Sequence, residues 1–341
     1  MGINISKIIP KKEINLSDLK NKTIAIDAYV ALYQFLTTIR QPDGTPLKDS
    51  SGNITSHISG LFYRNINLLQ EGIKPVYVFD GKPPELKQQE IKKRQEAKEM
   101  AEQKYKEARI RDDISEMKKY SSRTVKITTE MLEQSKELLQ ALGIPFVQAP
   151  SEGEAEAATL ARQNKVYAAA SQDYDALLYA TPYLIRNLTS ARRKKLPSGL
   201  YLDIKPELIT FQQVLNELGI DKDQLICLAI LVGTDYNPGG VKGIGQKRAL
   251  EIVQQNKYPV EIFKAVQKKY DFIFDWQEVF KQFSSYQSNQ IEEIKFQKPN
   301  PEKIKSFLKK YDFSENRIDS SLQKLQQIEE KKKQKGLSDF F

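Results

Sequence analysis

Three short apolar runs that each end on aspartate constrain the fold more than any other feature of the sequence. They are Thr23–Asp27, Val76–Asp80 and Val166–Asp173, and helical-looking sequence separates each from the next. Such runs are typical of strands in a parallel sheet that helices bury on both faces. Ligands of open α/β sheets bind outside the carboxyl ends of the strands, so the three aspartates are expected to converge on one site.

Further acids fall at strand ends and helix starts, and together they predict a metal site. Any one could be a surface charge or a helix cap, but an unpaired carboxylate at the end of a buried strand is energetically costly. Two like charges about 4 Å apart repel by roughly 4 kcal/mol at an effective dielectric of about 20, so a cluster requires protons or cations. The candidates are Asp27, Asp80, Glu152, Glu154, Asp173, Asp175 and Asp235.

The composition restricts such a site to oxygen ligands. Cys227 is the only cysteine and its apolar surroundings predict core packing, while the single histidine, His57, is interpreted as incidental. Disulfide frameworks and Cys/His zinc sites are therefore excluded. Oxygen ligands favour Mg²⁺, with Mn²⁺ as a substitute. Two such ions about 3.5–4 Å apart can activate a water and stabilise the leaving oxygen of a phosphodiester.

Spacing alone leaves open which glutamates near position 152 bind metal. On a regular helix Glu152 and Glu154 point about 200° apart, whereas Glu152 and Glu156 share a face. In a first helical turn both early acids could still face the strand ends. Ser151 and Glu154 also fit a capping box, which gives Glu154 an alternative role.

The segment 82–126 is dense in Lys, Arg, Glu and Gln and has few large apolar residues. This composition predicts long, exposed helices that stand off the core. A solvated hairpin without a role is the alternative, but the basic excess and the start directly after Asp80 favour a DNA-contacting element. The formal charge of +9, from 53 Lys and Arg against 44 Asp and Glu, also suits a polyanionic partner.

Downstream, the chain becomes glycine-rich after Asp235 and re-enters a helix over residues 246–255. Residues 284–301 read as a polar linker, and residues 306–335 look helical and heavily charged. The N-terminus has no apolar signal core and no stretch reaches membrane-spanning length. We therefore expect a monomer without membrane contact, cytoplasmic in an archaeon or nuclear in a eukaryote.

Four motifs, in this order along the chain, resemble the signature of the flap endonuclease family: Ile24–Ala28, Val78–Pro84, Ala149–Ala155 and Val232–Tyr236. The resemblance implies that Asp27, Asp80, Glu152 and Glu154 bind one metal ion, with Asp173, Asp175 and Asp235 for the other. It thereby resolves the ambiguity against Glu156. It also implies that Lys87 and Arg94 reach the scissile phosphate; their seven-residue offset places them on one helical face, where they can stabilise the transferring group.

The same resemblance implies further DNA contacts. Tyr33 would stack on a base near the cut, although packing in the core is nearly as good an interpretation of this residue. Arg40 and Arg64 would hold the template strand. Gly233, Gly243 and Gly245 would offer backbone groups to the downstream duplex in a helix-two-turn-helix, with a bound K⁺. The segment Asn237–Gly240 is one residue longer there than the eukaryotic pattern.

The C-terminal residues 334–341 resemble the peptide by which this family binds the sliding clamp (PCNA). The peptide comprises Gln334, Leu337, Phe340 and Phe341. The last three stand at i, i+3 and i+4, so one helical turn would present them to an apolar groove. Terminal phenylalanines after a charged tail are expected to be covered by a partner; docking onto the protein's own core is the alternative.

The resemblance also implies the architecture: an α/β, PIN-like 5′ nuclease fold whose mostly parallel central sheet is flanked by helices. We expect an N-terminal nuclease region over 1–98, a helical arch over 87–126 and an internal nuclease region over 127–260. The helix-two-turn-helix would lie near 232–256, followed by a helical region over 261–333 and the clamp peptide.

The function predicted from these features is hydrolysis of branched DNA at 5′ flap junctions, with 5′–3′ exonuclease activity, in Okazaki fragment processing and repair. A relative that acts mainly on bubbles, four-way junctions or free 5′ ends would keep the same fold. A non-catalytic adaptor that binds DNA and recruits a clamp is the alternative from another class. The presence of all seven acids counts against the adaptor.

Overall fold

A mixed seven-stranded sheet lies at the centre of the protein. The computed structural model describes residues 2–195, 199–289, 291 and 293–338. The five strands β6, β5, β2, β3 and β4 are mutually parallel, and β9 and β1 add an antiparallel edge, which confirms the predicted α/β fold. From edge to edge the strands are β1 (Lys12–Glu13), β9 (Glu207–Thr210), β6 (Tyr183–Arg186), β5 (Ala168–Ala170), β2 (Thr23–Asp27), β3 (Lys74–Phe79) and β4 (Phe146–Gln148).

The strands are buried on both faces, which explains why their sequences are continuously apolar. Successive side chains of a strand point to opposite faces. Ala25 of β2 and Val76 and Val78 of β3 pack into one core, while Ile24 and Tyr77 pack into the other. The two cores therefore fix the register of β2 and β3, and with it the positions of the aspartates that end them.

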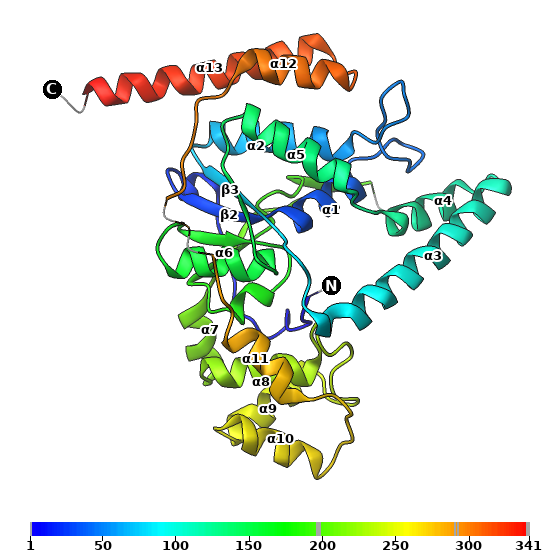
Figure 1. Cartoon of the computed structure of the whole chain (residues 1–341), viewed down its shortest axis with the longest axis vertical. Coiled ribbons are helices and arrows are strands. Elements are labelled where there is room, and N and C mark those ends of the chain that lie inside the picture. The colour runs from blue at the N-terminus through cyan, green and yellow to red at the C-terminus, as the bar shows by residue number, and fades with distance from the viewer. Residues whose placement is uncertain (1, 196–198, 290, 292, 339–341) are drawn as a thin grey trace.

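Helices cover the two faces in separate groups (Figure 1). One face carries α1 (Ala28–Thr38), α2 (Ser56–Gln70) and α5 (Thr129–Ala141), against which α12 (Pro301–Lys310) and α13 (Glu315–Ser338) pack. The other face carries α6 (Gly153–Arg162), α7 (Phe211–Leu218) and α8 (Lys222–Val232). Beyond α8 lie α9 (Gln246–Gln255), α10 (Pro259–Gln267) and α11 (Trp276–Ser284).

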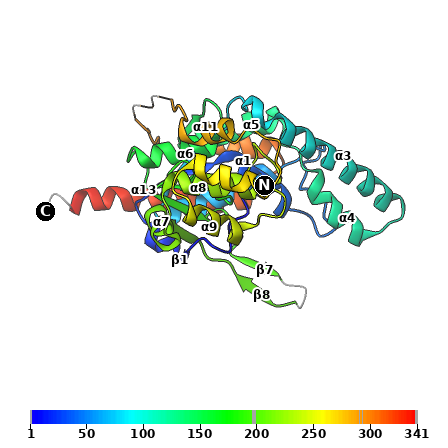
Figure 2. The same ribbon diagram turned by 90° about the horizontal axis from the view of Figure 1, so that it is seen from below.

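Two elements stand off this body (Figures 1 and 2). The helices α3 (Gln88–Ile110) and α4 (Ile114–Ser121) form an antiparallel pair, which we call the arch, and confirm the exposed helices expected over 82–126. A short hairpin of β7 (Arg193–Lys195) and β8 (Tyr201–Asp203) projects separately.

The helical region expected over 306–335 consists of two helices. α12 ends at Lys310, and the chain turns through Asp312, whose φ of 59° is incompatible with a continuing right-handed helix. One interpretation of the sequence was wrong. His57 is not incidental. It is fully buried in α2, and its Nε2 lies 2.8 Å from Gln134 Oε1 of α5, so it links two helices of the core.

Candidate active site

The aspartates that end three adjacent parallel strands meet at one edge of the sheet, as their placement predicted. Asp27 ends β2, Asp80 follows β3, and Asp173 and Asp175 follow β5. Since β3 and β5 pair with β2 on either side, all four carboxylates lie at the same end of the strands. Asp27 also caps α1, because its Oδ1 accepts a hydrogen bond of 2.9 Å from Val30 N.

Two glycines allow the end of β3 to approach the start of α6. Asp80 Oδ1 accepts a hydrogen bond of 2.6 Å from Gly153 N, the first residue of α6. A Cβ on Gly153 would stand 2.7 Å from that oxygen, and a Cβ on Gly81 would stand 2.3 Å from the Ala149 carbonyl oxygen. Any larger side chain would push the α6 carboxylates away from the strand ends.

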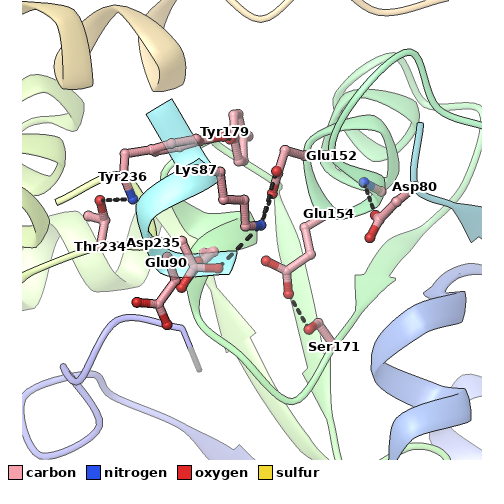
Figure 3. Close-up of polar contacts among 12 residues, drawn as sticks. Asp80, Lys87, Glu90, Glu152, Glu154, Ser171, Tyr179, Thr234, Asp235 and Tyr236 are labelled. Atoms are coloured by element: carbon pink, nitrogen blue, oxygen red, sulfur yellow. Dashed lines mark hydrogen bonds and ion pairs between the residues drawn. The ribbon is translucent and has the colours of Figure 1, made fainter. Parts of the chain in front are cut away.

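The expected capping box at Ser151 is wrong. The N-cap of α6 is Glu152, and its side chain makes no capping hydrogen bond. The Ser151 carbonyl instead accepts a hydrogen bond of 2.6 Å from Gly81 N, which holds Ser151 outside the helix. The Glu152 side chain is therefore directed to the cluster, and Glu154 is bonded there by the Ser171 hydroxyl (Figure 3).

The extreme N-terminus contributes to the site, which the sequence analysis missed. Ile3 N donates a hydrogen bond of 2.9 Å to Asp175 Oδ1. A Cβ on Gly2 would stand 2.5 Å from the same oxygen, so only glycine fits against Asp175 here. A glycine at position 2 was the one available signal, because the contact joins residues 172 positions apart.

Burial and mutual repulsion show that the seven carboxylates form one electrostatic cluster. Burial, followed by the charge of Glu152, raises the pKa of Asp80 to about 6. Burial, followed by Asp173, raises the pKa of Asp175 to about 7. The pKa values of Asp27 and Glu154 are also raised, first by burial and then by neighbouring carboxylates. Asp235 contributes to the shift at Asp175, so all seven candidates belong to the cluster.

Two cations from the base of the arch, Lys87 (Figure 3) and Arg94, enter this cluster. Lys87 Nζ lies 2.8 Å from Glu152 Oε2 and 3.2 Å from Asp235 Oδ2. Arg94 Nη2 lies 2.5 Å from Asp235 Oδ1, and Arg94 Nε pairs with Glu90 at 2.8 Å. Burial alone would lower the pKa of Lys87, but Glu152 and Asp235 outweigh it and raise that pKa. The helical face predicted from the spacing of Lys87 and Arg94 thus points at the acids.

Glu156, the alternative left open by periodicity, is bonded elsewhere. Its side chain is fully buried. Tyr286 Oη donates to its Oε2 at 3.0 Å, and Ser288 Oγ donates to its Oε1 at 2.9 Å. Both oxygens are thus engaged by the segment between α11 and α12.

The donor set fits a hard divalent cation in its chemistry, since seven carboxylates share one buried site. The side chains are nevertheless engaged with Lys87, Arg94, Ser171 and backbone N–H groups. Among the described residues, no three His, Cys, Asp or Glu side chains are disposed to hold a single ion.

Comparisons with known proteins identify the family. The XPG N-terminal domain matches residues 1–101, and the XPG I-region matches residues 143–235. The chain is 52% identical to Flap endonuclease 1 of Pyrococcus abyssi, over 100% of this chain and 98% of that relative. The chain belongs to the flap endonuclease family.

Solved structures agree with this membership. Flap endonuclease-1 from Methanococcus jannaschii matches with a TM-score of 0.77 and 42% identity, over 97% of this chain and 100% of that one. The catalytic core of Rad2 in complex with DNA substrate matches with a TM-score of 0.65 and 26% identity, over 92% and 96% of the two chains. The prediction of a metal-dependent nuclease is confirmed.

Residues predicted to contact DNA in this flap endonuclease lie in three different environments. Tyr33 is 42% exposed on α1, which excludes the alternative that it packs in the core. Arg64 on α2 is half-buried, and burial together with the nearby Arg192 lowers its pKa. Arg192, which the sequence analysis did not single out, therefore lies near enough for its charge to act on Arg64. Only its position in a run of basic residues, 192–195, could have indicated it.

Arg40 is engaged with the protein itself. Its guanidinium donates to the carbonyl oxygens of Leu36 and Gly44, at 2.9 and 2.7 Å, and to the Ser121 hydroxyl at the end of the arch. In this arrangement Arg40 joins α1, the following loop and the arch.

The glycine-rich segment between α8 and α9 holds its glycines in two different ways. Gly233 ends α8 with its N–H bonded to Ala229 O at 2.8 Å, and a Cβ there would stand 2.6 Å from Gly240 N. Gly233 is thus required for packing, and its N–H is already used. Gly245, by contrast, is the N-cap of α9, where the N–H groups of a first helical turn face outward. Gly243 precedes it with a φ of 88°.

The clamp peptide, residues 334–341, begins in α13 and ends outside the described residues. Gln334 and Leu337 belong to the last turns of α13, and Phe340 and Phe341 lie outside the described residues. No helix within the described ranges is long and apolar enough to cross a bilayer.

Proposed function

We propose that the seven carboxylates hold two Mg²⁺ ions, replaceable by Mn²⁺, and that the site cleaves DNA at the base of a 5′ flap. Asp27, Asp80, Glu152 and Glu154 would hold one ion, and Asp173, Asp175 and Asp235 the other. The observation that carries this proposal is the single electrostatic cluster at the ends of β2, β3 and β5. Two bound ions supply an activated water and neutralise charge on the leaving oxygen.

Lys87 and Arg94 supply the chain's own contribution to the chemistry. Both now pair with carboxylates of the cluster, Lys87 with Glu152 and Arg94 with Asp235. With metal held by those acids, the two side chains would be available to bind the non-bridging oxygens of the scissile phosphate. Positive groups held in a half-buried site stabilise charge that develops on a phosphoryl centre more strongly than they would in water.

The arch and the exposed cations support a branched DNA substrate. Lys87 and Arg94 lie where the arch joins the body, so a single strand that reaches the site passes the charged helices α3 and α4. Tyr33 would stack on a base beside the cut, and Arg64 with Arg192 would hold phosphates of the template strand. The similar Rad2 core bound to DNA substrate, and the names of the relatives, support the same substrate class.

The turn before α9 is proposed to bind the downstream duplex. Gly243 and Gly245 would present N–H groups to a phosphate, with a K⁺ shared between backbone oxygens and the DNA. Because the N–H of Gly233 is already bonded, we assign Gly233 a packing role only.

Residues 334–341 are proposed to bind a sliding clamp, which would place the enzyme at Okazaki fragment junctions and repair sites. The double substitution Phe340→Ala with Phe341→Ala should remove stimulation by the clamp, because the apolar anchors are lost, and should leave clamp-free cleavage unchanged. Cleavage rates with and without clamp measure this. Stimulation that survives the pair would show that the peptide does not bind the clamp.

The deciding experiment is cleavage of a 5′-labelled double-flap DNA with Mg²⁺, beside nicked, bubble and four-way-junction substrates. The flap should be released near its junction, and EDTA or Asp80→Ala should prevent release. Preferential cutting of bubbles or junctions would reassign the substrate. Binding without cleavage in both Mg²⁺ and Mn²⁺ would favour an adaptor.

A further inference from the structure

The segment between α11 and α12 runs back over the body and is bonded to it at several points. We call residues 285–289, 291 and 293–300 the strap. Asn289 Nδ2 donates to Gln148 O of β4 at 2.8 Å, and Gln297 N donates to Gly143 O at 3.0 Å. The Lys165 ammonium donates to Ile291 O. The strap therefore runs from the face that carries α6, along the edge strand β4, to the end of α5 on the other face.

One attachment lies next to the carboxylate cluster. Glu156 stands one helical turn after Glu152, on the same face of α6. Its buried carboxylate accepts the hydroxyl of Tyr286 on one oxygen and that of Ser288 on the other. The Tyr286 hydroxyl is also 3.5 Å from the Glu152 carbonyl oxygen. Two strap hydroxyls thus hold the first turn of α6 through the Glu156 carboxylate.

A chain of aromatic rings links the strap to the segment that carries Asp235. The Tyr286 ring packs edge-on against Tyr179 at 5.7 Å between centroids, and Tyr179 packs against Phe283 at the end of α11. Phe283 in turn packs against Tyr236, the neighbour of Asp235, at 5.2 Å. Of the two residues whose carboxylates pair with Lys87, Glu152 is contacted by Tyr286 of the strap, and the neighbour of Asp235 packs on Phe283 at the end of α11.

We infer that Glu156, Tyr286 and Ser288 form a positioning clasp, which fixes the first turn of α6 and thereby determines how tightly Glu152 and Glu154 bind divalent metal. The inference rests on the proposed function, because it takes those glutamates as ligands. Nothing in the clasp touches the reacting atoms. A buried carboxylate needs its hydrogen-bond donors, so loss of the two hydroxyls frees α6 to shift and carries the ligands with it. Groups that orient metal ligands typically change metal affinity by about 10- to 100-fold when removed.

The test is a titration of the DNA-free protein with Mn²⁺, with free ion measured by electron paramagnetic resonance. The double substitution Tyr286→Phe with Ser288→Ala should raise the Mn²⁺ dissociation constant by about tenfold. The Mg²⁺ concentration for half-maximal single-turnover flap cleavage should rise in parallel. Cleavage at saturating Mg²⁺ and flap affinity in EDTA should stay at the parent values. Ser285→Ala is the matched control, since the Ser285 hydroxyl donates to Lys281 O within the end of α11.

The outcomes separate the clasp from the metal assignment. If Asp175→Asn weakens Mn²⁺ binding and the clasp variants do not, the clasp is refuted and the metal site stands. If Asp175→Asn also leaves Mn²⁺ binding intact, the metal assignment itself fails. A lower melting temperature with unchanged Mn²⁺ affinity would reduce Glu156 to a purely structural role. If the double variant fails to fold, two milder variants test the clasp in the same titration. Tyr286→Phe removes one hydroxyl, and Glu156→Gln keeps one acceptor oxygen.

Discussion

The strand ends and the arch place charge in opposite ways. At the strand ends, acids of one sign lie close together, with Asp27 only 4% exposed, and burial followed by their mutual repulsion raises several carboxyl pKa values. Along the arch, charges of both signs lie in solvent, and within α3 only Ala101 and Ala108 are buried. The difference shows that the buried cluster stores unfavourable electrostatic energy that a cation can relieve. The arch supplies two cations, Lys87 and Arg94, where the regions meet.

The largest effect should follow removal of one acid from the cluster. Asp175→Ala and Asp80→Ala should each slow flap cleavage by at least about 10³-fold, because loss of a ligand removes several kcal/mol of transition-state stabilisation. Single-turnover rates would measure the loss, and flap affinity should persist. Asp319→Ala, which removes an exposed acid that pairs with Lys305 on α12, is the control. A near-parental rate in either cluster variant would contradict the metal assignment.

Removal of the lysine at the base of the arch should slow flap cleavage by a smaller factor. Lys87→Ala should lower the rate constant for cleavage by about 10²- to 10³-fold, as expected for a lost electrostatic contact to the transition state. Flap affinity should change little. Lys324→Ala, an exposed lysine on α13, should behave like the parent. An equal loss in affinity and in rate would mean that Lys87 only binds substrate.

A lower pH should raise the Mg²⁺ concentration that cleavage needs. The pKa values of Asp80 and Asp175 are raised to about 6 and about 7, so both carboxyls gain protons as the pH falls through that range. A ligand must be deprotonated to bind metal, so the Mg²⁺ concentration for half-maximal cleavage should rise by roughly tenfold between about pH 8 and about pH 6. A half-saturation point that does not move with pH would show that these carboxyls are ionised throughout.

The smallest effect is expected on the arch surface. Ile110 is 84% exposed at the end of α3, so Ile110→Ser should change the free energy of unfolding by less than about 0.5 kcal/mol. Phe62→Ala, in the core beneath α2, should lower it by about 3–5 kcal/mol. Chemical denaturation measures both. A large loss at Ile110 would show that the arch is packed more tightly than its exposure indicates.

The same contrast explains how much could be predicted from the sequence. Strand runs such as Thr23–Asp27 are predictable because burial on both faces imposes a continuous apolar pattern. Since strand ends determine where ligands bind, the strand pattern alone places the aspartates together in one site. The arch could be predicted as exposed helices, because its apolar residues are too sparse for a core. Assigning each ligand to an ion, by contrast, required the family resemblance.

Contacts between distant segments could not be predicted. The bond from Ile3 to Asp175 and the bonds from the strap to Glu156 leave no periodic trace. The N-cap of α6 moved from Ser151 to Glu152 because the Ser151 carbonyl is bonded to Gly81, 70 residues earlier. His57 was misjudged because one buried side chain in an otherwise polar stretch has no signature of its own. In each case a tertiary partner decided the outcome.

The acids of the cluster are synthesised far apart in time, because they lie far apart along the chain. The cluster takes Asp27 from β2 and Asp235 from after α8, and the strap bonded to α6 emerges later still. Chain segments emerge at about 5–20 residues per second during synthesis. A partly synthesised chain therefore lacks acids of the proposed metal site. We expect the growing polypeptide to be harmless to nucleic acid, with nuclease activity appearing only when synthesis is nearly complete.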